Sequence, residues 1–144
     1  VADSEYDSLD AAKDAGTAFV FMGHGTAHVA KVTYSQMQTQ MQELGYENVF
    51  IGTVEGEPEE TSAEAVIEAV KAAGYTNVVL RPLMVVAGDH ANNDMAGSDD
   101  DSWKTLFEAA GFTVDCQIHG LGEIADVQAL YVAHTKAAID ALNA

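Results

Sequence analysis

The stretch Phe19-Val-Phe-Met-Gly-His-Gly-Thr-Ala-His28 decides the fold. Its first half is an uninterrupted apolar run, which is typical of a buried strand, and the run stops at a glycine. Glycines on both sides of His24 permit a sharp turn of the backbone and leave the imidazole accessible. We therefore expect a strand that carries His24 to the edge of a sheet.

Two later segments repeat this arrangement. The apolar run of residues 48–54 is followed directly by Glu55, and the run of residues 78–87 is followed by Gly-Asp-His90. Each of three expected strands therefore ends, beside a glycine, in a side chain that can bind a metal.

Amphipathic segments separate the apolar runs and follow the last of them. Strands are expected within residues 19–23, 48–54, 77–86 and 112–118, and helices at residues 5–15, 29–44, 62–73, 101–110 and 124–142. This alternation predicts right-handed crossovers and therefore the α/β fold class, with a four-stranded parallel sheet flanked by helices on both faces. Ligands of such sheets bind beyond the carboxyl ends of the strands.

The length of the chain predicts its domain organisation. With 144 residues, 48% of them hydrophobic, the chain has the size of one domain. We assign residues 17–144 to this α/β domain and residues 1–16 to a lead-in segment or a linker remnant. The glycine-rich, acidic segment 87–101 is expected to be an irregular loop that is functional or mobile.

The charge of the chain excludes two kinds of partner. Six Lys+Arg against 23 Asp+Glu give a formal net charge of -17, which repels nucleic acids and anionic membranes and attracts metal cations. We expect neither a nucleic acid nor a membrane as partner, since no apolar stretch approaches the roughly 20 residues of a membrane span. The cytoplasm is the expected compartment, and an exported precursor is the alternative.

Five residues outside the three strand ends receive expectations of their own. Cys116 and Trp103 are expected in the core. Trp103 is expected to be an anchor at the start of a helix, and the alternative is that it offers a hydrophobic face to a substrate. We expect His28 to cap the following helix or to orient a substrate, and His119 to be an exposed loop residue or to contact a substrate carboxylate. Because His134 lies in mid-helix on an apolar stripe, we expect it to be a buried core residue.

Longer motifs occur in a fixed order over about residues 17–133. They are Met22-Gly-His-Gly-Thr-Ala-His28, Val54-Glu55-Gly56, Pro82-Leu-Met-Val-Val-Ala-Gly-Asp-His-Ala-Asn-Asn-Asp-Met95, Asp101-Ser-Trp-Lys104 and Gly120-Leu-Gly-Glu123. In this order they resemble the anaerobic cobalt chelatases of cobalamin biosynthesis, the sirohydrochlorin cobaltochelatases, which are class II tetrapyrrole chelatases. The third motif is long enough to be specific by itself.

The resemblance implies an activity and a set of site residues. In that family a His, a Glu and a second His bind the metal, and matching the motifs places these ligands at His24, Glu55 and His90. The first His is also regarded there as the base that takes protons from the macrocycle. The implied function is the insertion of Co²⁺ into sirohydrochlorin, with the metal as a substrate.

The resemblance also implies a partner. The family's enzymes are roughly twice as long as this chain and consist of two similar α/β halves that close over the tetrapyrrole. This chain resembles the carboxyl-terminal half. The implied partner is therefore a second copy of the chain, in a homodimer, or a missing amino-terminal half.

The residue types fit this chemistry. Two imidazoles and one carboxylate at one sheet edge form an open site for a borderline divalent cation such as Co²⁺, Ni²⁺, Fe²⁺ or Zn²⁺. A neutral imidazole near the macrocycle can accept the protons that the pyrrole nitrogens lose. Backbone N–H groups in turns can bind substrate carboxylates. The expected substrate contacts are Gly25, Thr26, Gly88, Asp89 and Asn92.

Other interpretations stay open. A half-chelatase can bind a metal, sirohydrochlorin or haem and pass it on without turnover, or it can be a structural half that needs an amino-terminal partner. Taken alone, His24 can also be a hydrogen-bonded turn histidine. Nucleotide binding and hydrolase chemistry are disfavoured because the sequence has no GxxxxGK[ST], GxGxxG or Gly-x-Ser-x-Gly motif.

Overall fold

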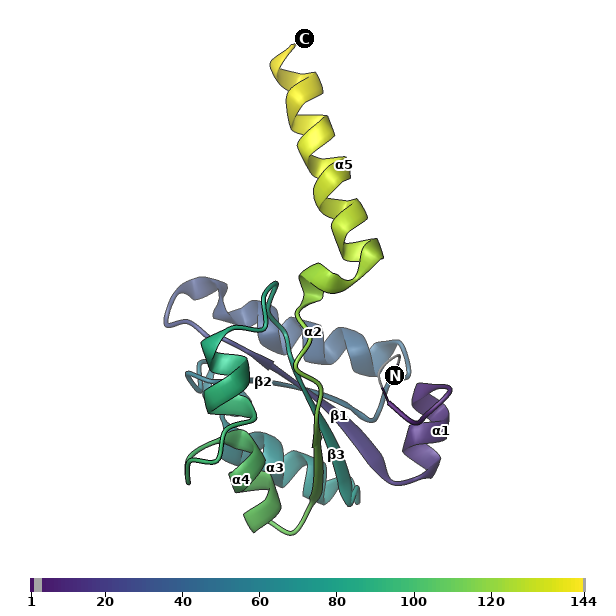
Figure 1. Ribbon diagram of the computed structural model, residues 1–144, viewed down its shortest axis with the longest axis vertical. Helices are drawn as coiled ribbons and strands as arrows, with labels where there is room; N and C mark the ends of the chain where they lie inside the picture. The colour runs from purple at the N-terminus through teal and green to yellow at the C-terminus, as the bar shows by residue number, and fades with distance from the viewer. Residues whose placement is uncertain (2–3, 144) are drawn as a thin grey trace.

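Four parallel strands form one sheet in the body of the molecule (Figure 1). The computed structural model describes Val1 and residues 4–143. The strands are β1 (Thr17–Gly23), β2 (Val49–Thr53), β3 (Asn77–Pro82) and β4 (Thr113–Cys116). Their order across the sheet is β2-β1-β3-β4, and Phe21 of β1 lies between Ile51 of β2 and Arg81 of β3.

Helices cover both faces of this sheet. The helices are α1 (Leu9–Asp14), α2 (Val32–Glu43), α3 (Ala63–Ala72), α4 (Trp103–Ala109) and α5 (Ala125–Leu142). Phe19 and Val79 pack with side chains of α1 and α2, whereas Val20 and Leu80 pack with side chains of α3 and α4. Successive strand residues therefore point into two separate cores. The predicted α/β class, with helices on both faces, is confirmed.

The ends of the helices follow from local sequence. Ser62 precedes α3 and its hydroxyl accepts a hydrogen bond from the N–H of Ala65, which is a typical amino-terminal cap. The same helix ends before Gly74, whose φ of 85° is a conformation that glycine adopts without strain. Short turns called η1 (Val29–Lys31), η2 (Glu59–Thr61), η3 (Ala91–Met95) and η4 (Leu121–Glu123) complete the chain.

The third strand is shorter than the sequence predicted. It ends at Pro82 instead of continuing to residue 86. The neighbouring strands explain this difference, because β1 ends at Gly23 and β4 ends at Cys116, which lies opposite Leu80. Beyond these points β3 has no strand to pair with, however apolar its residues are.

The last helix differs most from the expectation. α5 projects away from the body (Figure 1), and in the described part of the chain η4 is the one element with which it makes extensive contact. Leu130 and Tyr131 are exposed, and so is His134. The prediction that His134 is a buried core residue is therefore wrong, because no neighbouring element covers the apolar stripe. No described helix combines the length and apolar character that a membrane span requires.

The open edge of β2 is closed by a side chain. The Gln38 amide nitrogen donates to the carbonyl oxygen of Val49 (2.9 Å), and its amide oxygen accepts from the N–H of Ile51 (2.7 Å). This amide therefore satisfies two backbone groups that a further strand would otherwise pair with.

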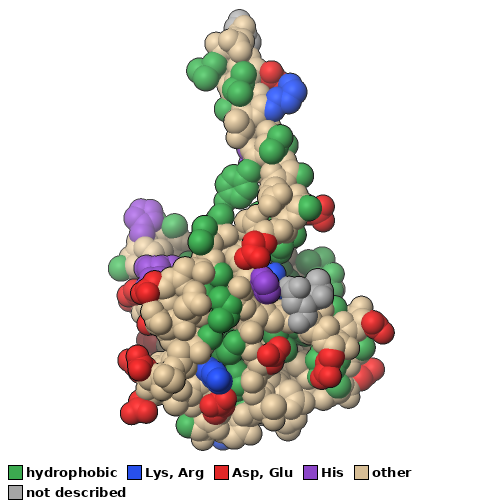
Figure 2. All heavy atoms as spheres, viewed as in Figure 1, with side chains coloured by type: hydrophobic (Ala, Val, Ile, Leu, Met, Phe, Trp, Pro, Cys, Tyr) green, Lys and Arg blue, Asp and Glu red, His purple; other side chains and the backbone are tan. Residues whose placement is uncertain are grey.

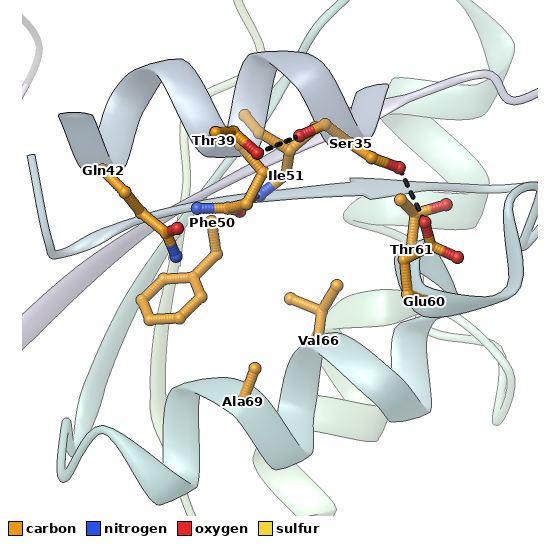
Figure 3. A pocket seen from close by; sticks show the side chains of 10 residues that line it. Ser35, Thr39, Gln42, Phe50, Ile51, Glu60, Thr61, Val66 and Ala69 are labelled. Atoms are coloured by element: carbon orange, nitrogen blue, oxygen red, sulfur yellow. Dashed lines mark hydrogen bonds between the residues drawn. The ribbon is translucent and has the colours of Figure 1, made fainter. Parts of the chain in front are cut away.

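Nearby, a cavity of about 320 Å³ lies between α2 and α3, where Ser35 donates a hydrogen bond to Glu60 (Figure 3).

Replacing Gln38 by alanine is expected to lower the free energy of unfolding by about 1–3 kcal/mol, because it leaves buried backbone groups of Val49 and Ile51 without partners. Urea denaturation measures the change. Gln36→Ala, on the exposed side of the same helix, is the matched control and should stay within about 0.5 kcal/mol of the wild type. Equal loss in both variants would contradict this role.

Two core predictions agree with the structure. Trp103 begins α4 and is only 3% exposed. Cys116 is half-buried against the core on the α3 and α4 side. Burial raises the pKa of the Cys116 thiol from 9.0 to about 11.

Cys116 should therefore react slowly with alkylating reagents. Because only the thiolate reacts, this pKa predicts about 100-fold less reactive form near pH 8 than in the unfolded chain. The rate should rise as the pH approaches 11. Iodoacetamide labelling followed by mass spectrometry measures it, with the urea-unfolded chain as control. Equal rates in the folded and unfolded chains would contradict the raised pKa.

Candidate functional site

The three predicted metal ligands lie at the same edge of the sheet. His24 follows β1, Glu55 follows β2, and His90 lies in the segment that follows β3. Because β1 stands between β2 and β3, the carboxyl end of β1 is flanked by the carboxyl ends of both other strands. This strand order places His24 between the segment that carries Glu55 and the segment that carries His90.

The side-chain geometry agrees with this order. The imidazole rings of His24 and His90 meet edge to face, with centroids 4.8 Å apart and planes at 82°. Nε2 of His24 lies 4.0 Å from Oε1 of Glu55. His24 therefore contacts one predicted ligand on each side. All three side chains remain between 38% and 54% exposed, so a ligand from solvent can reach them.

The three side chains do not close around one point. Among residues 1 and 4–143, no group of three or more His, Cys, Asp or Glu side chains is arranged to hold a metal ion. His24 pairs with Glu55 and contacts His90 edge to face, but the set is more open than a structural metal site, whose ligands usually enclose the ion.

The turn that carries His24 requires glycine. Gly25 has a φ of 92°, and a Cβ at this position would lie 2.9 Å from Cβ of Glu55 and 3.0 Å from Cβ of Thr53. The N–H of Gly25 donates to the hydroxyl of Tyr34 (3.1 Å). Nδ1 of His24 lies 2.9 Å from the carbonyl oxygen of Gly25, which leaves Nε2 on the side of Glu55.

His90 sits on a helical turn that the sequence did not predict. The expectation of an irregular loop over residues 87–101 is wrong in part, because η3 (Ala91–Met95) is a turn of π-helix directly after His90. Ala91 and Met95 are both fully buried and anchor this turn. Asp94 approaches His90 from it, with Oδ2 2.5 Å from Nδ1. This pair was not predicted, although the spacing of four residues between His90 and Asp94 is the sequence feature that could have indicated it.

The predicted substrate-binding residues lie on the same two turns, and their polar groups make local hydrogen bonds. The Thr26 hydroxyl accepts from the N–H of His28 (3.1 Å). Asp89 accepts from the Asn93 amide (2.7 Å), and the Asn92 amide donates to the carbonyl oxygen of Gly88 (2.7 Å). These bonds hold the turns in shape around the imidazoles.

The other two loop histidines have local partners. His28 caps η1, since its Nδ1 accepts from the N–H of Ala30 (3.1 Å). His119 is half-exposed and lies 2.9 Å from a carboxylate oxygen of Glu123. Hydrogen bonds from His119 and from the N–H of Gly120 lower the pKa of the Glu123 carboxyl. Neither histidine joins His24 and His90.

Exposed apolar side chains lie on the segments that follow β1 and β3, and carboxylates gather beside Glu55. Val29, Val85 and Val86 are exposed by 79%, 47% and 72% and lie on the segments that follow β1 and β3. Figure 2 shows hydrophobic side chains beside His side chains on the body. Glu55 also lines a groove of about 570 Å³ with four further carboxylates, those of Glu64, Asp94, Asp100 and Asp101. The loops at this edge of the sheet thus carry exposed apolar side chains, and the groove beside Glu55 carries negative charge.

Fold and site together define a class of protein. This is an α/β domain that presents two imidazoles and a carboxylate, open to solvent, at the ligand-binding edge of a parallel sheet. Such a donor set suits a borderline divalent metal.

Comparison with known proteins names the family. The protein-family model described as cobalt chelatase (CbiK) matches residues 2–140, and the chain belongs to this family. The sirohydrochlorin cobaltochelatase of Salmonella typhimurium is 42% identical over 121 residues, which are 84% of this chain and 44% of that protein. The sirohydrochlorin cobaltochelatase CbiKC of Nitratidesulfovibrio vulgaris is 33% identical over 135 residues, 94% of this chain and 46% of that protein. The chain thus spans about half the length of the curated relatives it matches, and the resemblance to cobalt chelatases is confirmed.

Proposed function

We propose that this chain takes part in the insertion of Co²⁺ into sirohydrochlorin. The observation that carries the proposal is the position of His24 between Glu55 and His90, at the ligand-binding edge of a sheet, in a member of the cobalt chelatase family. The names of both relatives support the same substrate and metal.

In the proposed mechanism, His24, Glu55 and His90 hold the metal weakly before it is transferred. A chelatase needs an incomplete site, because the metal must shed water and then pass to four pyrrole nitrogens that bind it more tightly. The open arrangement of the three side chains supports this requirement. Ni²⁺, Fe²⁺ and Zn²⁺ suit the same donor set.

Two protons leave the macrocycle as the metal enters. Once the metal has left His24, its Nε2, the nitrogen that does not face the Gly25 carbonyl oxygen, accepts the two protons one after the other and releases the first before it takes the second. Glu55, 4.0 Å from that nitrogen, stabilises the imidazolium that forms. The proton then passes to solvent, to which both side chains are about half exposed.

The macrocycle has apolar faces and acidic side chains, and the site offers a match for both. Val29, Val85 and Val86 would contact the ring system. The turns that contain Gly25, Thr26, Gly88, Asp89 and Asn92 would bind substrate carboxylates through backbone N–H groups. The N–H groups of Gly25 and Asn92 already donate to the Tyr34 hydroxyl and to the Gly88 carbonyl oxygen, so the proposed donors are those of Thr26, Gly88 and Asp89. The acidic groove beside Glu55 would attract the cation.

We propose a partner that covers α5 and closes the site, either a second copy of the chain in a homodimer or an amino-terminal half. Leu130, Tyr131 and Leu142 on this helix are 58%, 57% and 86% exposed. Most of the stability of a helix in a protein comes from tertiary packing of its apolar face, so a covering surface would stabilise α5.

The mass of the chain in solution tests the homodimer. Light scattering should give twice the chain mass, and Leu130→Asp combined with Leu142→Asp should give the monomer by removing apolar contact area. Lys136→Glu, a charge change on another side of the helix, is the control that should keep the dimer. A monomeric wild type would contradict the homodimer and favour the amino-terminal half.

The competing function is a non-catalytic carrier of a metal, sirohydrochlorin or haem. Absorbance of sirohydrochlorin after anaerobic addition of Co²⁺ separates the two functions, with a control without protein for spontaneous insertion. A rate that increases with protein concentration supports a chelatase. Tight binding of metal or tetrapyrrole without acceleration supports the carrier.

A further inference from the structure

Asp94 contacts His90, one of the three predicted metal ligands, and the proposed mechanism gives this contact no role. Its Oδ2 lies 2.5 Å from Nδ1 of His90. An ionised carboxylate can only accept a hydrogen bond, so Nδ1 of His90 must carry the proton. In a neutral ring the lone pair is then on Nε2, the nitrogen that remains available to a metal.

The fold holds this pair in place. His90 and Asp94 are four residues apart on one helical turn, which puts their side chains on the same face. Ala91 and Met95 are fully buried and fix the turn against the core. The N–H of Gly97 closes the turn by donating to the carbonyl oxygen of Asn93 (2.9 Å). A Cβ at Gly97 would lie 2.2 Å from that oxygen, so the close approach requires glycine.

His24 shows the same arrangement with a weaker acceptor. Its Nδ1 lies 2.9 Å from a backbone carbonyl oxygen, that of Gly25. Both imidazoles therefore have an acceptor at Nδ1, but only His90 has a charged one. A hydrogen bond to a charged acceptor is stronger than one to a neutral acceptor, so the carboxylate of Asp94 holds its imidazole more firmly than a backbone carbonyl can.

We infer that Asp94 is a positioning residue, which holds the His90 ring with Nδ1 protonated and thereby reserves Nε2 for the divalent cation. Carboxylates in this role are known to fix the tautomer and orientation of metal-binding imidazoles. This inference rests on the proposed function in one respect, because it takes His90 as a ligand of the metal. Asp94 itself does not contact the metal or the macrocycle.

The first test needs neither metal nor turnover. Nitrogen-15 NMR distinguishes the two tautomers of a neutral imidazole, and the His90 signals are assigned by their loss in His90→Gln. The wild type should show the Nδ1–H tautomer, and Asp94→Ala should show a mixture. Asp94→Asn, whose amide oxygen still accepts a hydrogen bond, should keep most of the Nδ1–H form. An unchanged tautomer in Asp94→Ala would overturn the inference.

The second test measures the affinity for Co²⁺ alone. Asp94→Ala should weaken binding about 10- to 100-fold, and Asp94→Asn should weaken it less. Asp100→Ala is the matched control, since it removes the same charge from the same acidic groove without touching an imidazole. Equal weakening of Co²⁺ binding by Asp100→Ala and Asp94→Ala would mean that the loss of one negative charge from the groove explains the change in affinity, and it would overturn the inference.

These readouts separate the inference from the proposed function. If the wild type binds Co²⁺ but does not accelerate insertion, the proposed chelatase activity fails, while the tautomer and the affinity still decide the role of Asp94. Circular dichroism confirms that each variant is folded. If Asp94→Ala does not fold, Asp94→Asn and Asp94→Ser provide the same comparison between an acceptor that reaches His90 and a shorter side chain.

Discussion

His90→Ala is expected to reduce protein-dependent cobalt insertion by about 100-fold or more. The substitution removes an imidazole that contacts His24 edge to face and that we propose as a metal ligand. With only His24 and Glu55 left, the site has lost one of its two nitrogen donors. The initial rate of the absorbance change of sirohydrochlorin, under anaerobic conditions, measures the effect.

An exposed residue outside the site provides the control. Gln36→Ala, on the exposed side of α2, should retain the wild-type rate. His24→Ala should be as slow as His90→Ala. The double variant should be little slower than either single variant, because groups that act in one site are not additive. Full activity in His90→Ala would contradict the assignment of this residue.

Gly52→Ala is expected to destabilise the fold strongly. A Cβ at this position would lie 2.3 Å from Cη2 of Trp103, 2.9 Å from Cγ2 of Val66 and 3.0 Å from the carbonyl oxygen of Thr61. Trp103, Val66 and Thr61 are each 3% exposed, so the side chains have no space into which to move. Overpacking of this kind typically costs about 1–3 kcal/mol and occasionally more.

Chemical denaturation measures this loss of stability. Gly88→Ala is the control, because no heavy atom lies within 4 Å of the position its Cβ would take. Its free energy of unfolding should stay within about 0.5 kcal/mol of the wild type. If Gly52→Ala unfolds at the wild-type denaturant concentration, the contact between β2 and Trp103 is looser than the structure indicates.

The class of fold could be predicted from the sequence because its signals are local. Each apolar run ends at a turn residue, and each helix has its own apolar face. The end of β3 could not be predicted in this way, because it depends on where β1 and β4 stop. The exposure of His134 could not be predicted either, since an apolar stripe indicates which side can be buried but not what covers it.

The position of the site could be predicted from the sequence, but the arrangement of its side chains could not. That His24, Glu55 and His90 share an edge follows from parallel strands. That His24 lies between the other two follows from the order of the strands, which the apolar pattern does not contain. Asp94 was missed as a partner of His90 because the turn of η3 is too short to produce a recognisable helical period.

The amide of Gln38 also has a consequence for chains in a crowded solution. A bare edge strand is a template onto which a neighbouring chain can add its own strand, and repeated addition leads to aggregates or fibrils. At β2 this template is interrupted, because Gln38 already occupies the donor of Ile51 and the acceptor of Val49. The side chain of Gln38 thus discourages uncontrolled growth of the sheet at β2 and leaves assembly to other surfaces of the molecule.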